Sequence, residues 1–416
     1  MASVLVVGAG FAGLNAAKIF GENGKHNVTV LDRHNYHLFQ PLLYQVAMAG
    51  LSPAEIATPI RSVLSGYKNV RVLLGEVQEV LPSEKKVRGD FGEIFFDYLL
   101  VATGAQHSYF GKNEWEEFAP GLKTLEQATE IRCRVLTAFE LAEREADLDK
   151  QKAYLTFVVI GGGPTGVELA GALGEISRYT LNKDFRSIDP RRTRIILIEA
   201  GKRILASFSE ECSAHALRDL EKLGVSVWAN TRVTNVSAEG VTMGNEFLRA
   251  TTVIWGAGVQ PSPLNTQMSA PLDRSGRVKV NPDLSLPGHP EIFVAGDQVF
   301  FENKGAALPG QAPVAMQQGR HAARNILALA SGKPTKPFQY LDKGQMATIG
   351  RSRAVVEFHG LRFFGFFAWL TWLVVHVYYL IGFKNRLIVL IQWIWSYMSY
   401  RRGARLIVQK AWKQQR

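Results

Sequence analysis

Two short apolar runs in this chain each end in a glycine-rich turn. Residues 3–13 read SVLVVGAGFAG, and residues 156–166 read TFVVIGGGPTG. A β-branched run of this length predicts a buried strand, and the glycine turn after it predicts the start of a helix. Each unit continues through a helix-compatible stretch into a second apolar strand, at residues 28–31 and 195–198. The pattern predicts two βαβ units of the doubly wound type.

Both units end their second strand in an acidic residue and close with another apolar run. The acids are Asp32 and Glu199, and the second unit is longer because of a charged insertion at about residues 182–194. The closing runs lie at residues 99–104 and 253–258, and a third run of the same kind lies at residues 292–297. We therefore expect an α/β fold with two Rossmann-like domains, the second inserted in the first.

Each glycine motif has the spacing G-x-G-x-x-G in the context that nucleotide binding needs. The first glycine permits a tight turn, the second lets the backbone approach a pyrophosphate, and the third lets the helix pack on the strand. The helix N-terminus then faces the phosphates, and the acid accepts hydrogen bonds from the ribose. A purely structural role is the alternative. The predicted binding residues are Gly8, Gly10, Gly13 and Asp32 in the first unit and Gly161, Gly163, Gly166 and Glu199 in the second.

The positions of the two motifs suggest which nucleotide each one binds. The first domain begins at the N-terminus and is completed by the run at residues 292–297, which suits a permanently bound FAD. The inserted domain suits a nicotinamide cofactor that binds and leaves. Glu199 would repel the 2′-phosphate of NADPH and so favours NADH, unless its side chain faces solvent and does not discriminate.

Net charge is concentrated at the C-terminal end. Of the formal charge of +11, nine Lys and Arg residues lie from Phe358 onward with no Asp or Glu among them, which leaves +2 for the first 357 residues. Basic residues among Trp, Tyr and Leu runs suit an anionic lipid surface better than a phosphate backbone. We therefore expect contact with the surface of a lipid bilayer and no nucleic-acid partner.

The tail contains two apolar blocks. Residues 363–383 are about as long as the ~20 residues of a spanning helix, whereas residues 387–400 are shorter and more polar. Trp and Tyr residues are spread along both blocks, which favours helices lying in the interface over a transmembrane segment. His376 is predicted to be packed or hydrogen-bonded. With no signal peptide visible, the expected location is the cytoplasmic side of the cell membrane.

These features resemble the two-dinucleotide-binding-domain flavoproteins and, among them, the type II (single-subunit, non-pumping) NADH:quinone oxidoreductases. The resemblance covers essentially the whole chain and is most specific at residues 35–46, 292–299 and 312–319 and in the tail. It implies hydride transfer from NADH to FAD and two-electron transfer to a membrane quinone without proton pumping. On this basis we expect an FAD-binding domain at residues 1–121 and 288–335, an NADH-binding domain at 122–287, and a membrane-anchoring region at 336–416.

The same resemblance implies further contacts to FAD. Thr103 and Gly104 would lie against the cofactor, and Asp297 would hold its ribityl chain. Gln40 and Pro41 would lie beside the isoalloxazine.

The family's quinone signature, A-Q-x-A-x-Q, is altered in this chain. Residues 312–317 read APVAMQ, so Pro313 replaces the first Gln. Gln317 is the expected hydrogen-bond partner of the quinone oxygen, with Pro313 and Met316 beside it. An apolar helix start without this role is the alternative.

Two charged residues match family positions with proposed roles in catalysis. Glu168 would lie near the nicotinamide and the flavin, although the helix dipole alone would also favour a carboxylate there. Lys343 resembles a lysine proposed to deliver protons to the quinone, although most lysines are simply solvated.

Cysteine and histidine usage separates the alternatives. Cys133 and Cys212 form no C-x-x-C, which disfavours a disulfide reductase. A sulfide:quinone oxidoreductase needs reactive cysteines at the flavin, and neither residue is well placed. That activity, or another FAD-dependent NAD(P)H reductase, is the alternative function, and a nucleotide sensor without turnover is the non-enzymatic one. Histidine spacing predicts no metal site, and a homodimer is compatible with the sequence.

Overall fold

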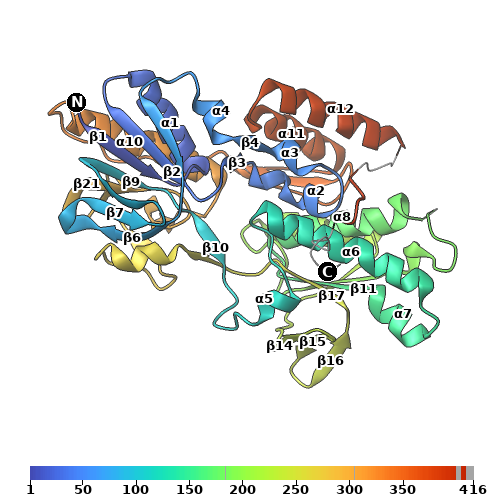
Figure 1. Ribbon diagram of the computed structural model, residues 1–416. Helices are drawn as coiled ribbons and strands as arrows, with labels where there is room; N and C mark the ends of the chain where they lie inside the picture. Colours follow the sequence, from blue (N-terminus) through green and yellow to red (C-terminus); the bar gives the residue numbers. More distant parts are fainter. Residues whose placement is uncertain (183, 304, 400–403, 409–416) are drawn as a thin grey trace, which may run out of the picture. The chain divides into compact units, whose positions relative to one another are not determined.

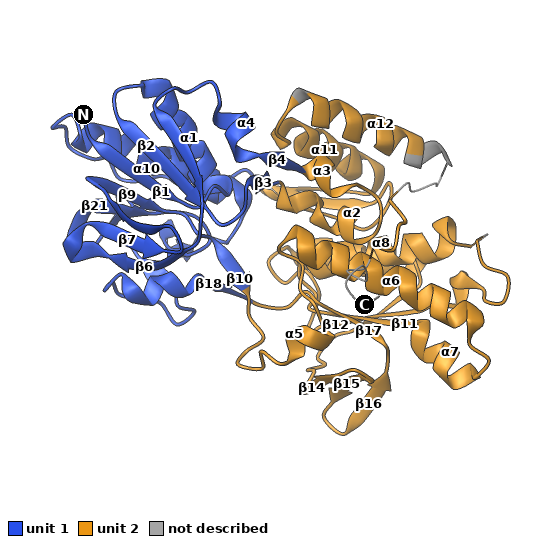
Figure 2. Ribbon diagram, in the orientation of Figure 1, with its two compact units in different colours: residues 1–38, 57–106, 259–343 blue, residues 39–56, 107–258, 344–416 orange. Residues whose placement is uncertain are grey.

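The computed structural model describes residues 1–182, 184–303, 305–399 and 404–408. The chain divides into two compact units (Figure 2). Unit 1 comprises residues 1–38, 57–106 and 259–343, and unit 2 comprises residues 39–56, 107–258 and 344–416. Each unit is described by itself. The predicted basic or apolar positions that lie outside the described residues are Lys183, Tyr400, Arg401, Arg402, Lys410, Lys413 and Arg416.

Unit 1 is built on a largely parallel sheet (Figure 1). Its strands are β1 (Ser3–Val7), β2 (Asn27–Asp32), β5 (Val70–Leu74), β9 (Tyr98–Val101), β20 (Ser285–Leu286) and β21 (His289–Val294). They run in the order β20-β21-β9-β1-β2-β5, and β20 pairs antiparallel with β21. Val4, Leu5 and Val6 of the central strand are buried on both faces, which is why the run is apolar without alternation.

Two helices of unit 1, α1 (Phe11–Asn23) and α10 (Ala312–Leu329), pack directly against each other. Their contact depends on Gly319, because a Cβ there would lie 2.1 Å from the carbonyl oxygen of Ala12. The obstacle is helix backbone, which cannot rotate away as a side chain would. The glycine therefore sets how closely the two helices approach.

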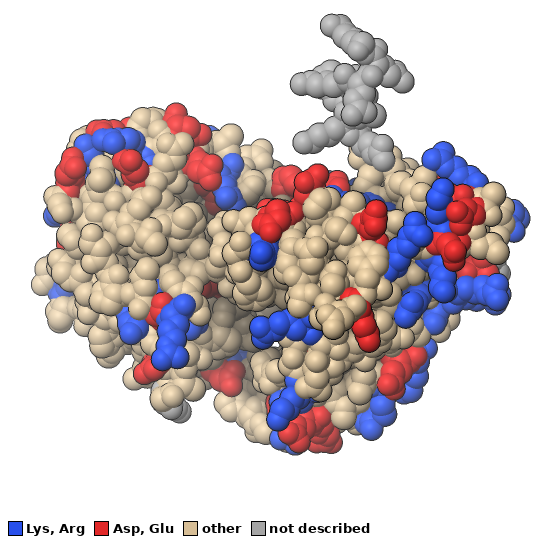
Figure 3. Space-filling model, turned by 90° about the horizontal axis from the view of Figure 1, so that it is seen from below, with Lys and Arg blue, Asp and Glu red and all other residues tan. Residues whose placement is uncertain are grey.

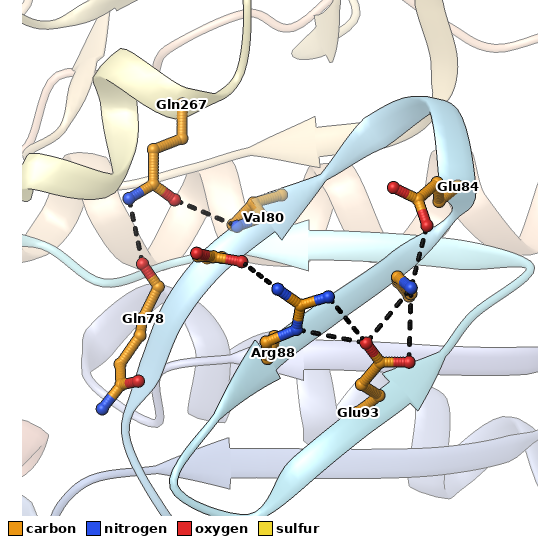
Figure 4. Close-up of polar contacts among 8 residues, drawn as sticks. Gln78, Val80, Glu84, Arg88, Glu93 and Gln267 are labelled. Carbon is orange, nitrogen blue, oxygen red and sulfur yellow. Dashed lines mark hydrogen bonds and ion pairs between the residues drawn. The ribbon is translucent and has the colours of Figure 1, made fainter.

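A smaller antiparallel sheet of unit 1 is formed by β6 (Val77–Leu81), β7 (Lys86–Gly89) and β8 (Gly92–Phe95). Arg88 donates to Glu93 on the neighbouring strand at 2.9 Å, and Gln267 binds the backbone of β6 through both ends of its amide (Figure 4). Its Oε1 accepts from Val80 N–H at 3.1 Å, and its Nε2 donates to Gln78 O at 2.9 Å. The side chain thus supplies hydrogen bonds that a neighbouring strand would otherwise provide.

The shorter elements of unit 1 connect these sheets. They are β3 (Tyr36–Leu38), β4 (Ala57–Pro59), α4 (Ile60–Leu64), η2 (Pro82–Glu84), β10 (Ala105–His107, at the boundary with unit 2), β18 (Val259–Pro261), η5 (Pro263–Gln267), β19 (Val278–Lys279), β22 (Val299–Phe300), β23 (Glu302–Asn303) and β24 (Ala306–Ala307).

Unit 2 contains a second parallel sheet, with helices against it. Its strands are β11 (Thr156–Ile160), β12 (Arg194–Ile198), β13 (Val225–Trp228) and β17 (Thr252–Trp255), in the order β13-β12-β11-β17. The helix after β11 is α8 (Pro164–Glu175), and α6 (Leu125–Arg144) begins at a capping box in which Thr124 and Gln127 bind each other's backbone N–H. Phe139 of α6 stacks on Phe157 of β11 with ring centroids 5.4 Å apart.

Other elements of unit 2 extend this core. They are η1 (Gln40–Leu42), α2 (Leu43–Ala47), α3 (Pro53–Ile56), α5 (Trp115–Phe118), α7 (Leu148–Tyr154), η3 (Ile176–Thr180), η4 (Pro190–Arg192), α9 (Glu210–Lys222), β14 (Asn235–Ser237), β15 (Gly240–Met243) and β16 (Glu246–Arg249).

The C-terminal part of unit 2 forms an antiparallel sheet followed by two helices. The elements are β25 (Gln345–Thr348), β26 (Ala354–Phe358), β27 (Leu361–Phe364), α11 (Gly365–Tyr379) and α12 (Phe383–Ser399). Trp372 and His376 of α11 are buried and stack at 4.2 Å, and His376 Nδ1 lies 2.6 Å from Trp372 O, so the predicted packed histidine is confirmed. Among the described residues, the helices are too short or too polar for any one of them to cross a membrane.

An aromatic cluster attaches these helices to the segment 39–56. Trp372 lies between Tyr44 and Trp393, at centroid distances of 6.4 and 5.4 Å. Trp393 Nε1 donates to Gln45 Oε1 at 2.8 Å, and Gln392 of α12 is hydrogen-bonded to Glu55. The tail helices are thus part of the core of unit 2 on one side.

The compact units and the expected domains do not share all their boundaries. Residues 39–56 and 107–121, expected with the first nucleotide-binding domain, lie in unit 2, and residues 259–287, expected with the second, lie in unit 1. The segment 39–56 lies in unit 2 because it packs on the C-terminal helices, which follow it by some three hundred residues and give no local sequence signal.

We expect the Gly319→Ala substitution to lower the free energy of unfolding by about 1–3 kcal/mol, the usual cost of overpacking. The cost arises because the added methyl group would force α1 and α10 apart. Thermal unfolding of the flavin-loaded protein measures it. Gly66→Ala is the matched control, since Gly66 is exposed and a Cβ there meets no atom within 4 Å. Equal unfolding temperatures for the two variants would contradict the expectation.

Candidate functional site

The first glycine loop of unit 1 is held at its start by two hydrogen bonds to the end of β2. Gly8 N–H donates to Leu31 O at 2.7 Å, and Ala9 N–H donates to Asp32 Oδ2 at 2.6 Å. Gly8 has φ of +96°, and a Cβ there would lie 2.4 Å from Ala102 O. At Gly13 a Cβ would lie 1.8 Å from Gly8 O, so the helix can pack only without a side chain. In contrast, a Cβ at Gly10 meets no atom, which leaves this face of the loop open to a ligand.

His37 braces the same loop from a position that the sequence analysis assigned no role. Its Nδ1 lies 2.9 Å from Ala9 O, and since that oxygen can only accept, Nδ1 carries the proton. Burial lowers the pKa of His37 from 6.5 to about 4, so the ring is neutral at physiological pH. Its Nε2 has no hydrogen-bond partner within the described part of the chain. The ring therefore fixes the carbonyl of the residue whose N–H contacts Asp32.

The other residues predicted to bind FAD in unit 1 lie at the carboxyl ends of neighbouring strands. Thr103 and Gly104 follow β9, and Asp297 follows β21, which pairs with β9 in parallel. Thr103 Oγ1 donates to Gln298 Oε1 at 2.6 Å, and Gln298 Nε2 donates to Val101 O at 2.7 Å. Ligands of open α/β sheets bind at this edge, so these residues are well placed for a cofactor.

Gln40 and Pro41 lie in the other unit. They form η1 of unit 2, and Gln40 Nε2 donates to Lys123 O at 3.3 Å. The structure thus brings Gly8, Thr103 and Asp297 together within unit 1, and it places Gln40 and Pro41 beside the start of α6.

The second glycine loop, in unit 2, repeats the construction of the first. Gly161 N–H donates to Ile198 O at 2.8 Å, and Gly162 N–H donates to Glu199 Oε2 at 2.6 Å. Gly161 has φ of +105°, and a Cβ at Gly166 would lie 1.8 Å from Gly161 O. A Cβ at Gly163 meets no atom within 4 Å. This loop therefore offers the same open face as the first.

The helices after the two loops leave their N-terminal N–H groups without side-chain caps. Gly10 precedes α1 and Gly163 precedes α8, and neither position can supply a capping oxygen. By comparison, α6 is capped by Thr124 and α9 by Ser209. A phosphate at an uncapped N-terminus would satisfy these groups and interact with the helix dipole, so both loops fit the pyrophosphate of a dinucleotide.

The predicted quinone signature occupies the first turns of α10 in unit 1. Pro313 lies at the first turn, where a missing N–H costs nothing, and Met316 is largely buried. Gln317 is bound to the backbone of Leu341, to which its Nε2 donates at 2.9 Å and from which its Oε1 accepts at 3.0 Å. One hydrogen and one lone pair of the amide remain for another partner.

Gln318, the next residue on α10, has a role that the sequence analysis did not assign. It is buried, and its Oε1 accepts from Gly296 N–H at 2.8 Å, directly before Asp297. Lys343, predicted to deliver protons, lies exposed at the end of unit 1.

Glu168 is the titratable residue of α8 with a strongly altered environment. Burial of the carboxyl raises its pKa from 4.5 to about 8, and the backbone hydrogen bond from Thr348 offsets only part of this effect. The helix dipole acts most strongly on the first turn of a helix. Glu168 is the fifth residue of α8 and so lies beyond that turn. The carboxyl therefore holds a proton at neutral pH and can release one near pH 8.

A cavity of about 90 Å³ lies in unit 2 beside the same helix. Ala172 and Glu175, one and two turns after Glu168, line it together with Thr348. The remaining lining residues come from α2 and the segment after it, the β25–β26 turn, α11 and α12, and most are aromatic or polar: Tyr44, Gln45, Gly50, Gly350, Arg351, Trp369, Trp372 and Trp393.

The family models and known relatives identify the enzyme class. Residues 2–319 match the pyridine nucleotide-disulphide oxidoreductase family, and residues 343–402 match the NDH2 C-terminal domain. The type II NADH:quinone oxidoreductase Ndh of Mycobacterium tuberculosis is 42% identical to this chain, and the match covers 96% of this chain and 89% of that protein. The chain belongs to the type II NADH:quinone oxidoreductases.

Other comparisons agree with this membership. The type II NADH:quinone oxidoreductase of Staphylococcus aureus is 31% identical over 83% of this chain and 87% of its own length. The solved structure of NDH2 from Plasmodium falciparum in complex with NADH has a TM-score of 0.88, with 20% identity, and covers 98% of this chain and 100% of that chain. A sulfide:quinone oxidoreductase from Aquifex aeolicus shares the fold at a TM-score of 0.75, with 21% identity, and covers 93% of this chain and 92% of that chain.

The type II family membership confirms the predicted fold class, enzyme and cofactors. The chain is an FAD-dependent NADH dehydrogenase that uses a quinone and pumps no protons, and its family is membrane-associated. The comparisons support this reading over the sulfide-oxidising alternative. Cys212 is buried and Cys133 is half-buried, and within the described residues no cluster of His, Cys, Asp and Glu could hold a metal ion.

The raised pKa of Glu168 predicts a pH-dependent contribution to stability. The folded chain keeps this carboxyl protonated up to about pH 8, whereas the unfolded chain ionises it near 4.5. The free energy of unfolding therefore falls as pH rises through this window. Between about pH 6 and about pH 9 we expect the wild type to lose on the order of 2 kcal/mol more than Glu168→Gln, measured by thermal unfolding of the flavin-loaded proteins. Parallel pH profiles for the two proteins would contradict the raised pKa of the Glu168 carboxyl.

Proposed function

We propose that the two glycine loops divide the two nucleotides of this reaction between them. The first loop, with Gly8, Gly10, Gly13 and Asp32, would hold FAD, and the second, with its own glycines and Glu199, would hold NADH. The observation that carries this proposal is the repeated geometry, in which each acid binds the loop backbone and each following helix has an uncapped N-terminus. The domain assignment expected from the sequence is proposed on the same ground.

FAD fits the residues that unit 1 assembles. Thr103 and Gly104 would lie against the cofactor, Asp297 would bind its ribityl hydroxyls, and Gln40 and Pro41 would complete the isoalloxazine environment. When bound, FAD supplies the centre that takes a hydride from NADH and returns two electrons to a quinone. The protein's part is placement. His37 and Gln298 hold the backbone around the first loop and β9, which preorganises the site.

Five residues are proposed to serve the reaction, three beside the quinone and two in proton transfer. Gln317 would donate to a quinone oxygen with the amide hydrogen that Leu341 does not use, and Pro313 and Met316 would pack beside the ring. Glu168 would store a proton near the reaction because its pKa of about 8 lies close to physiological pH. Lys343, exposed to solvent, would pass protons inward from the cytosol.

Gln317→Ala tests the quinone assignment. Because the quinone is the one substrate that the amide would contact, we expect the KM for quinone to rise about tenfold, the effect of one lost hydrogen bond of typical strength. Reduction of the flavin by NADH, followed by absorbance without oxygen, should stay at the wild-type rate.

The control for this test must weaken the packing of residues 336–343 on α10 without removing a group that contacts the quinone. His321, one turn later on α10, binds Lys336 O through Nε2 at 2.8 Å, so His321→Ala removes another contact between α10 and residues 336–343. An equal rise in quinone KM for both variants would show that loop packing, rather than a hydrogen bond to quinone, explains the effect.

The outer faces of the tail helices are proposed to bind the membrane from its cytoplasmic side, where NADH is available. Figure 3 shows, on the face that it displays, Lys and Arg interspersed with Asp and Glu and broad uncharged areas between them. On α11 and α12 the large exposed side chains recur every three or four residues, opposite the buried Trp372 and His376. They are Phe366, Phe367, Leu370, Val374, Tyr378, Leu387, Ile391, Ile394 and Trp395.

Replacing this stripe tests the attachment more sharply than deleting the tail, because deletion would also remove the buried aromatic cluster. We expect Phe367→Glu combined with Ile394→Glu to lower binding to anionic lipid vesicles at least tenfold in a sedimentation assay, since charged groups would enter the acyl region. Leu148→Glu is the control, because Leu148 is also an exposed apolar residue, 76% accessible, but lies on α7. Full vesicle binding by the double variant would show that this stripe is not the membrane-binding surface. Sizing of the same samples tests whether the protein forms a homodimer.

A further inference from the structure

The Glu199 carboxylate lies in a notch between two glycines. Its Oε2 accepts the N–H of Gly162 at 2.6 Å, and its Oε1 accepts the N–H of Gly201 at 2.5 Å. A Cβ at Gly162 would lie 2.9 Å from Oε2, and a Cβ at Gly201 would lie 2.9 Å from Oε1. Carbon and oxygen do not pack so closely, so either methyl group would push the carboxylate away from the loop.

Backbone conformation does not account for these two glycines. Neither Gly162 nor Gly201 has a positive φ, unlike Gly161. The left-handed conformation that favours glycine is therefore not the reason for a glycine at either position. Around Gly162, the space for a side chain is limited by the end and the Cβ of Glu199 and by Ile204 Cγ2 at 2.9 Å.

The first loop carries side chains at the equivalent positions. There the acid is Asp32, whose Oδ2 accepts from Ala9 N–H at 2.6 Å and whose Oδ1 accepts from His34 N–H at 2.7 Å. Ala9 corresponds to Gly162, and His34, two residues past the acid, corresponds to Gly201. Asp is one methylene shorter than Glu. The longer acid of the second loop thus occurs together with the loss of both flanking side chains.

We infer that Gly162 and Gly201 are specificity-determining residues for the nicotinamide nucleotide. By leaving room for the longer carboxylate, they let two backbone N–H groups fix it at the mouth of the second loop. A carboxylate fixed there accepts a hydrogen bond from a ribose hydroxyl and cannot turn away from a 2′-phosphate, so NADPH meets a repulsive group. The inference rests on the proposed function in placing NADH at the second loop.

The experiment compares nucleotides that differ only in the 2′-phosphate. We expect Gly162→Ala to reduce the ratio of kcat/KM for NADH to kcat/KM for NADPH about tenfold, because the displaced carboxylate loses its fixed position. Calorimetry with ADP-ribose and 2′-phospho-ADP-ribose should show the same change in relative affinity without turnover. Gly201→Ala tests the other side of the notch and serves as well if one variant fails to bind flavin.

A double substitution provides the rescue. Gly201→Ala is combined with Glu199→Asp, because a Cβ at Gly201 meets only Oε1 and Cδ of Glu199 within 4 Å and the shorter acid withdraws both. This variant should recover most of the preference for NADH that Gly201→Ala loses. A general loosening of unit 2 would not be repaired by shortening the acid.

Glu199→Gln separates the two ways of failing. If Glu199→Gln lowers the preference while both alanine variants keep the wild-type ratio, or if the rescue variant is no better than Gly201→Ala, the inference that the two glycines determine specificity is wrong. If Glu199→Gln also keeps the wild-type ratio and affinities, the assignment of NADH to the second loop fails instead.

Discussion

The contact between an acidic residue at the end of a strand and the N–H of a glycine loop occurs in both units. In unit 1 it joins Asp32 to Ala9, and in unit 2 it joins Glu199 to Gly162. Each contact ties the second strand of a βαβ unit to the turn after the first strand. The turn is thereby held open on the side where the helix N-terminus has no cap. Each acid is thereby held beside the loop that is proposed to bind a nucleotide.

The two loops differ in which group donates a hydrogen bond to the loop carbonyl. The carbonyl of the central loop residue also needs a donor, because a buried unpaired carbonyl is costly. In unit 1 the donor is the side chain of His37, and in unit 2 it is the backbone N–H of Leu205, at 2.7 Å from Gly162 O. Burial lowers the pKa of His37 to about 4, so the ring is neutral, and the contact with Ala9 O places its single proton on Nδ1.

The C-terminal helices have two sides with different purposes. Their inner side, with Trp372 and Trp393, packs on Tyr44 and Gln45 and belongs to the core of unit 2. Their outer side carries an apolar stripe suited to lipid. The tail is thus not an appendage that can be removed without consequence. Trp369, Trp372 and Trp393 of these helices also line the cavity beside α8, the helix that bears Glu168.

The sequence by itself determined the features that depend on local pattern. The strands, the glycine turns and the acids are each encoded within a few residues, and the structure shows all of them where periodicity and spacing predicted, with the type II family confirmed by comparison. Only the tertiary structure decided which distant residues support them. His37, Gln298 and Gln318 lie in segments on which the family resemblance rests, but no local pattern shows which backbone groups they bind, because folding alone brings those groups to them. The same holds for Gln317, whose amide is shared with Leu341, and for residues 39–56, which pack with the tail. Local sequence encodes turns and strands, whereas burial and long-range hydrogen bonds exist only once the chain has folded.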